Sequence, residues 1–350
     1  MIWMGEEYRG QKVFNNKVAL KIFLAIVVLL CAVVISFFIG RYKIEPMRLV
    51  QLLTTAPSNW LASSDTSVFY YIRLPRILLA VLVGAALSTA GALFQGVFRN
   101  PLVSPDILGV SAGCCLGAAL GIVLSRYISI PYLMQILAFM FGILAMILAY
   151  SIASISRGEP VVMLILAGMI VGSFANAALS FIKFTADPYE ELPAIVFWIM
   201  GGLYRANWYM VLNILIILIP SMLLIILLSW KVNILSLGDE EASSLGINTR
   251  CFRLVLLGLG TLIVASCVSV SGSIGWVGLV IPHAARIIVG PDHKYSIPMS
   301  MLIGGAFVVL MDNIARSLIS AEIPISILTA AIGTPFFAYL LIKGRGSAWR

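Results

Sequence analysis

Charged residues are scarce in this chain. Only 11% of its 350 residues are Asp, Glu, Lys or Arg, and 61% are hydrophobic. Soluble domains have roughly 45–50% apolar residues, so a mean hydropathy of +1.04 excludes an ordinary soluble fold. The composition predicts an all-α, polytopic membrane protein, because in lipid the backbone groups of a spanning segment can bond only within its own helix.

The motifs of several functional classes are missing as well. No GxxxxGK[ST] loop occurs, and the glycines and lysine of 343–346 lack the spacing that cradles a phosphate. His283 and His293 have no acid or cysteine at metal-ligand spacing, and the five cysteines form no CxxC pair. The net charge of +8 comes without a compact basic patch, which favours lipid headgroups over nucleic acid. We therefore predict no catalytic residue, no metal site and no cofactor bound by this chain.

Nine windows contain no Asp, Glu, Lys or Arg and are long enough to cross a membrane. They are residues 22–40, 77–98, 107–125, 127–156, 160–182, 206–230, 254–285, 295–311 and 323–342. A bilayer core of about 30 Å needs about 20 helical residues, so 254–285 is too long for one crossing. Its glycines and serines at 271–278 favour a break there. The sequence predicts a single membrane domain, residues 1–350, with about ten helices, the eighth of them short.

An even number of helices places both termini on the same side of the membrane. Cytoplasmic loops are rich in Lys and Arg, and most of the 23 basic residues fall on the cytoplasmic side when both termini lie there. This orientation places 231–253 in the cytoplasm. It places 183–207 outside, as a loop whose apolar half predicts a short helix.

Residues 231–253 form a polar island between two apolar windows. Three consecutive acids, Asp239, Glu240 and Glu241, must lie in water because carboxylates are costly in hydrocarbon. Apolar residues recur around them at roughly helical spacing, namely Leu235, Leu237, Ala242, Leu245 and Ile247. A solvated linker needs no such apolar face, so the island predicts contact with a soluble partner.

Charge inside the predicted helices is nearly limited to Asp312, four residues before Arg316. A helical ion pair explains this spacing. Ion-coupled carriers usually keep a titratable relay near the bilayer midplane. A secondary carrier that works without ATP is therefore the less favoured alternative.

Several long stretches resemble the FecCD family of permease subunits. They are RLPRILLAVLVGAALSTAGALFQGVFRNPLVSPDILGVSAG at 73–113, SLGDEEASSLGI at 236–247, GSIGWVGLVIPHAARIIVGPDHK at 272–294 and AEIPISILTAAIGTPFFAYLLIK at 321–343. The resemblance implies a type II ABC importer permease of ten helices in a prokaryotic cytoplasmic membrane. It also implies a second permease copy, forming a homodimer or a pair of close relatives, a cytoplasmic ATPase dimer that uses the ATP, and an extracytoplasmic binding protein. The implied cargo is an iron-siderophore, haem or cobalamin, with molybdate or tungstate as the alternative.

The resemblance also implies roles for three groups of residues. The polar island matches the helix that couples to the ATPase, through Leu237, Gly238, Asp239, Glu240, Glu241, Ala242, Leu245 and Gly246. Arginines that dock the binding protein correspond to Arg73, Arg76 and Arg316, which topology also puts near the outer surface. The inner gate corresponds to Pro160, Val161, Val162 and Met163. These gate residues are apolar where some relatives have hydroxyls, and a hydrophobic constriction can seal by dewetting.

Overall fold

The computed structural model describes residues 2–52, 63–156, 159–319 and 321–343, and the regular structure of these residues is entirely helical. In chain order the helices are α1 (Ile2–Phe38), α2 (Pro46–Leu52), α3 (Ser64–Ser67), the π-helical turn η2 (Val68–Arg73), α4 (Leu74–Val97), the 3-10 turn η3 (Pro105–Leu108), α5 (Val110–Leu124), α6 (Leu133–Ile155), α7 (Pro160–Thr185), α8 (Glu191–Ile199), α9 (Trp208–Leu237), α10 (Asp239–Ser244), α11 (Thr249–Ser271), α12 (Val277–Val289), α13 (His293–Ser317) and α14 (Ile325–Lys343).

Seven helices in the described part of the chain are long and apolar enough to cross a membrane. They are α1 from Asn16 onward, the continuous run Ser64–Val97 that includes α4, and α6, α7, α9, α11 and α13. Three shorter apolar helices accompany them, α5, α12 and Ile325–Tyr339 of α14. These ten helices confirm the predicted all-α polytopic fold.

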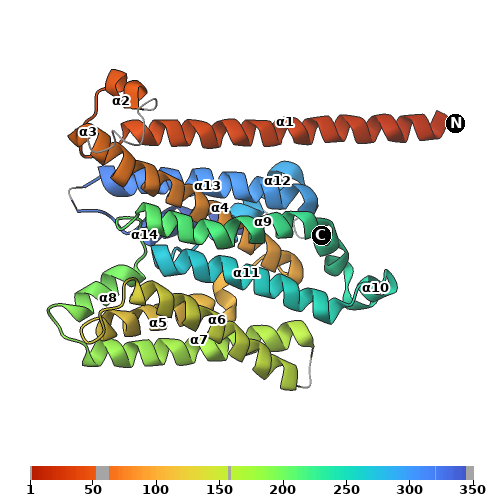
Figure 1. The fold of residues 1–350 in the computed structure, drawn as a ribbon. Helices are drawn as coiled ribbons and strands as arrows, with labels where there is room; N and C mark the ends of the chain where they lie inside the picture. The colour runs from red at the N-terminus through yellow and green to blue at the C-terminus, as the bar shows by residue number, and fades with distance from the viewer. Residues whose placement is uncertain (1, 53–62, 157–158, 320, 344–350) are drawn as a thin grey trace.

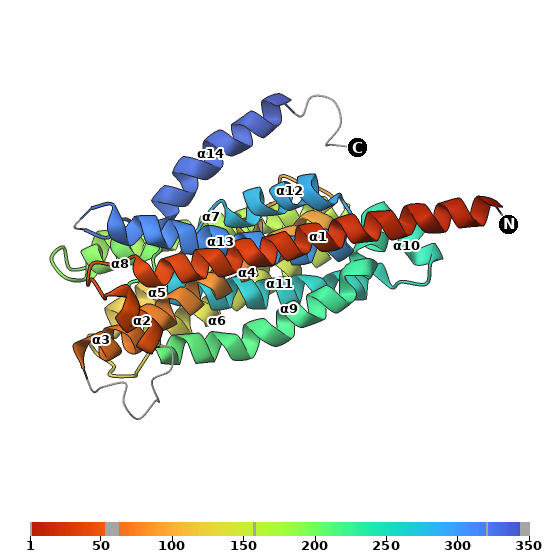
Figure 2. The same cartoon turned by 90° about the horizontal axis from the view of Figure 1, so that it is seen from above.

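The spanning helices lie side by side in an elongated bundle (Figure 1). The short helix α10 projects from the end at which α1 begins, whereas α2, α3 and α8 lie at the opposite end. Figure 2 shows that α14 leaves the bundle at the α8 end and runs back at an angle, apart from the other helices. The molecule therefore has two distinct ends, one marked by α10 and the other by α8.

The central helix is α4, whose residues from Leu79 to Val97 are almost all buried against α9, α11, α12 and α13. Glycine allows two of these approaches. A Cβ atom at Gly91 would lie 1.9 Å from the carbonyl oxygen of Gly278 in α12, and one at Gly84 would lie 2.2 Å from that of Gly304 in α13. Helices in membranes pack most closely through such small faces, so α4 holds α12 and α13 by backbone contact.

The long apolar window 254–285 is interrupted as predicted. Helix α11 ends at Ser271 and α12 begins at Val277. Between them Gly272, directly after α11, has φ +68°, and Trp276, directly before α12, has φ +70°. These positive φ values prevent one continuous helix. A side chain at Gly272 would also lie 2.2 Å from the Trp198 carbonyl oxygen. The eighth apolar helix, α12, is consequently only 13 residues long.

Helix α8 lies within the stretch 183–207, at the end opposite α10. The turn before it is organised by Asp187, whose Oδ1 atom accepts the backbone N–H groups of Glu190 and Tyr189 at 2.9 Å each. These bonds favour the charged form and lower the pKa of the Asp187 carboxyl.

Candidate functional site

The helix α10 presents a mixed apolar and acidic surface at one end of the bundle. It follows Gly238, whose φ of +140° allows the chain to turn sharply out of α9. Ala242 is fully buried and anchors α10 against α9 and α11. Leu237 and Leu245 are 63% and 61% exposed, and Glu240 and Glu241 beside them are exposed as well. Two exposed leucines flanked by acids suit contact with another protein better than contact with water alone.

The third acid of the polar island has a different orientation. Asp239 accepts a hydrogen bond from Nη2 of the buried Arg253 at 2.6 Å. The same carboxylate oxygen lies 3.9 Å from Nη2 of Arg99, at the end of α4. Asp239 therefore braces α10 from within the molecule, whereas Glu240 and Glu241 face outward.

The predicted gate residues form the first turn of α7. Pro160 is the first helical residue, a position that tolerates proline because its N–H would be unbonded there. Val161 is only 6% exposed and packs inside the molecule, whereas Val162 is 42% exposed and Met163 is partly buried. Of the two valines, only Val162 is turned outward, where it could line a passage.

A cavity of about 270 Å³ lies between the gate turn and the α10 end of the molecule. Its walls come from α6, α7, α10 and α11 and include Pro160, Leu164, Asp239, Arg250 and Arg253. The structure thus brings predicted coupling and gate residues to one end of the bundle, where Asp239 and Pro160 line the same cavity.

The three arginines predicted to dock a binding protein lie at the opposite end, but they are buried. Arg73, Arg76 and Arg316 are 3%, 8% and 6% exposed. Arg73 donates to the carbonyl oxygens of Phe37 at 2.5 Å and of Tyr42.

Arg76 connects three parts of the chain. Its Nε donates to Asp312 Oδ1 at 2.9 Å, and its Nη1 and Nη2 form a forked pair with Glu322 at 3.0 Å each. Arg316 donates to the carbonyl oxygen of Ser36 at 2.8 Å and to Asn313 Oδ1 at 2.5 Å. It also lies 3.6 Å from Asp312, the helical pair expected from the sequence.

Docking of a binding protein through Arg73, Arg76 and Arg316 stays a prediction, and the structure adds where their guanidinium groups bond. Their location at the end opposite α10 agrees with the predicted topology, but their partners could not be foreseen, because Asp312 and Glu322 lie 236 and 246 residues from Arg76. All three side chains are engaged inside the protein, so a docking partner would meet guanidinium groups that are already bonded.

Comparison with known proteins identifies this architecture. The profile of the FecCD transport family matches residues 27–343. The chain belongs to the FecCD family. It is thus a multi-pass membrane permease of the ABC importer class, and the family's permease subunits have no ATPase site of their own.

Individual members of the FecCD family are similar over most of the chain. The molybdate import system permease protein MolB of Haemophilus influenzae is 41% identical over 316 residues, which cover 90% of this chain and 93% of MolB. The hemin transport system permease protein HmuU of Yersinia pestis is 36% identical and covers 82% and 87%. A solved metal-chelate type ABC transporter in an inward-facing conformation is 39% identical, with a TM-score of 0.81 and coverage of 92% of this chain and 98% of that one.

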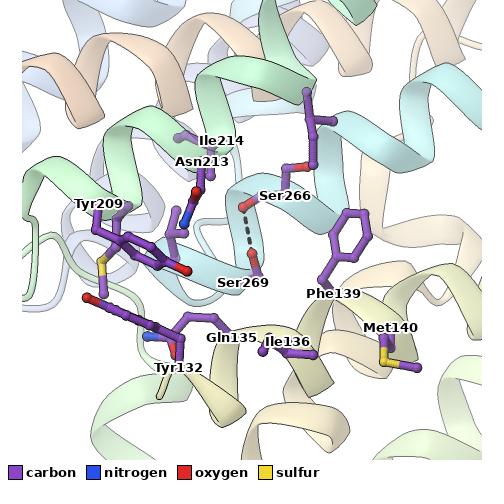
Figure 3. Close-up of a pocket in the computed structure, with 13 residues that line it drawn as sticks. Tyr132, Gln135, Ile136, Phe139, Met140, Tyr209, Asn213, Ile214, Ser266 and Ser269 are labelled. Atoms are coloured by element: carbon purple, nitrogen blue, oxygen red, sulfur yellow. Dashed lines mark hydrogen bonds between the residues drawn. The ribbon is translucent and has the colours of Figure 1, made fainter. Parts of the chain in front are cut away.

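This FecCD permease has a further cavity that the sequence did not indicate. It has a volume of about 200 Å³ and is lined by residues of α6, α9 and α11 (Figure 3). In its lining the rings of Tyr132 and Tyr209 stack with centroids 3.9 Å apart, and Gln135 and Asn213 lie beside them. Each tyrosine lies at the start of a helix, and only the enrichment of tyrosine at membrane interfaces could have pointed to them.

Proposed function

We propose that this permease imports a metal chelate, which a binding protein delivers from outside and a dimer of ATPase subunits drives inward. The observation that carries the proposal is the exposed surface around α10, formed by Glu240 and Glu241 of the helix and by Leu237 and Leu245 on either side of it. A short helix flanked by two exposed leucines and edged by acids fits a groove in a partner protein. The chain has no P-loop of its own, so this partner supplies the ATP hydrolysis.

In this proposal the α10 end is cytoplasmic and the α8 end faces the binding protein. The start of α1 lies at the α10 end (Figure 1), in agreement with a cytoplasmic N-terminus. The detached helix α14 exposes Ile327, Ile332 and Tyr339 by 50%, 43% and 54%. An exposed apolar helix apart from the bundle supports pairing with a second copy of the permease.

A bulky chelate is favoured over a small anion by the apolar character of α7. Beyond the gate turn this helix exposes Ile170, Phe174, Phe181 and Phe184 by 59%, 73%, 68% and 87%. The polar side chains that α7 exposes among them, such as Ser173, Asn176 and Ser180, are neutral. Burying a small dianion without a charged partner is costly, whereas a chelate encloses its metal charge in organic groups. Molybdate or tungstate is the second candidate, supported by the 41% identity with the molybdate permease.

The proposal is tested by reconstituting the permease with its ATPase and binding protein in liposomes. Uptake of haemin, cyanocobalamin, a ferric hydroxamate and molybdate is measured with and without ATP. We expect ATP-dependent uptake of one of the three chelates and no uptake by the permease alone. Uptake of molybdate would establish the second candidate, and uptake by the lone permease down an ion gradient would establish the secondary carrier instead.

A further inference from the structure

In the proposed function, movement of α10 on the ATPase must reach the gate residues in the first turn of α7. Helix α10 packs against α9 and α11, and the cavity of about 270 Å³ separates it from the first turn of α7. The packed path from α10 to α7 therefore runs through α11 and α6. A side chain that bridges α10 and the start of α7 would give a shorter path.

Arg99 occupies a backbone position that favours glycine. Helix α4 ends in a Schellman motif, in which the N–H of Asn100 donates to Gln95 O at 3.1 Å and that of Arg99 donates to Gly96 O at 3.2 Å. This motif needs a left-handed residue at the position of Arg99, whose φ is +51°. A residue with a Cβ atom is strained in this conformation, so the arginine side chain is expected to have a use that offsets the strain.

The guanidinium of Arg99 lies between two carboxylates from separate elements. Its Nη2 atom is 3.7 Å from Glu159 Oε1 and 3.9 Å from Asp239 Oδ1. Asp239 is the first residue of α10 and is held by Arg253 at 2.6 Å. Glu159 is the N-cap residue of α7 and precedes Pro160, a position that restricts its backbone to extended conformations. A force on Glu159 is therefore passed directly to the start of the gate turn.

We propose that Arg99 is the positioning residue that links α10 to the gate, by holding Asp239 and Glu159 in one ion-pair chain. This inference rests on the proposed function, since it assigns the path by which the ATPase moves the gate. The side chains of Arg99, Asp239 and Glu159 are 32%, 36% and 59% exposed. Ion pairs this exposed are weak, as a link must be if it is remade in every transport cycle.

The test uses Arg99→Gly in the complete complex of permease, ATPase and binding protein in liposomes. The cargo is whichever of haemin, cyanocobalamin, ferric hydroxamate and molybdate the wild type accumulates. Glycine relieves the left-handed strain, so the isolated permease should unfold at a higher temperature than the wild type. The cargo imported per ATP hydrolysed should nevertheless fall by about five-fold or more, since each exposed pair is worth up to about that factor. A purely structural Arg99 cannot produce a more stable protein that couples less well.

Two further variants serve as a charge-conserving comparison and as a control. Arg99→Lys keeps the charge and should retain part of the coupling. Arg126→Gln removes a pair of the same length, 3.9 Å to Glu191 near α8, and should keep the wild-type ratio. If the wild type transports and Arg99→Gly keeps its import per ATP, the link is refuted while the proposed function stands. If the wild type shows no ATP-dependent uptake of any of the four compounds, the proposed function fails and the link fails with it.

Discussion

A single methyl group at Gly91 should separate α4 from α12. In Gly91→Ala the new Cβ would lie 1.9 Å from the carbonyl oxygen of Gly278 and 2.7 Å from its Cα. Every one of these neighbours is backbone, so no rotamer change can relieve the contact. A normal carbon–oxygen contact is about 3.4 Å, so the two helices must move apart by roughly 1.5 Å at this crossing.

The expected cost follows from two opposing effects. Overpacking of this kind destabilises by about 1–3 kcal/mol, and a backbone contact that cannot yield belongs at the upper end of that range. Alanine regains up to about 1 kcal/mol through its higher helix propensity. We therefore expect the free energy of unfolding to fall by about 2 kcal/mol.

The matched control is Gly258→Ala in α11, where a Cβ atom meets nothing within 4 Å. This variant should gain up to about 1 kcal/mol, so the same substitution should have opposite signs at the two sites. The free energy of unfolding is measured by titrating the purified permease in detergent micelles with SDS and following tryptophan fluorescence. Equal effects at both positions would refute the close α4–α12 contact.

Three other predictions concern the two ends of the bundle. Arg76→Met leaves the buried Asp312 without its main partner and should cost about 3 kcal/mol of unfolding free energy by SDS titration, and adding Asp312→Leu should recover part of it. Val162→Ser should increase the leak of ligand from vesicles. Val161→Ser, at a buried site, should instead lower the free energy of unfolding by about 1–2 kcal/mol. Equal leak from both variants would contradict the outward orientation of Val162. Glu240→Lys should lower import per ATP while binding-protein docking, measured by co-purification, is kept; loss of docking would contradict a role at the ATPase side.

The helices and their number could be predicted from the sequence because lipid leaves a spanning segment few alternatives. The break in 254–285 could be predicted too, because clustered glycine and serine favour a break wherever they occur in a helix. The direction in which each side chain of the polar island points could not be predicted from the sequence. The acids 239–241 are consecutive in the sequence, yet Asp239 turns inward to Arg253 while its two neighbours face outward.

Partners distant in sequence explain what the sequence could not reveal about Arg73, Arg76 and Arg316. Their position at the end opposite α10 agrees with the predicted topology, but the local sequence does not show which side chains they contact. Only the fold brings Asp312 and Glu322 to Arg76 and Ser36 to Arg316. The left-handed backbone of Arg99, with φ +51° at the end of α4, could not be predicted for a related reason, because it is a property of the folded backbone.

The two ends of the bundle differ in how their charges are held, and this difference bears on where the molecule can move. At the α8 end, Arg76 and Asp312 are 9% and 1% exposed and lie 2.9 Å apart, and breaking such a buried pair costs about 3–5 kcal/mol. At the α10 end, Arg99 and Glu159 are 32% and 59% exposed and 3.7 Å apart, and pairs of this kind are worth about 0–1 kcal/mol. The free energy of one ATP-driven step can therefore rearrange the α10 end at far lower cost. The buried pair of Arg76 and Asp312 should therefore persist through the movements that rearrange the α10 end.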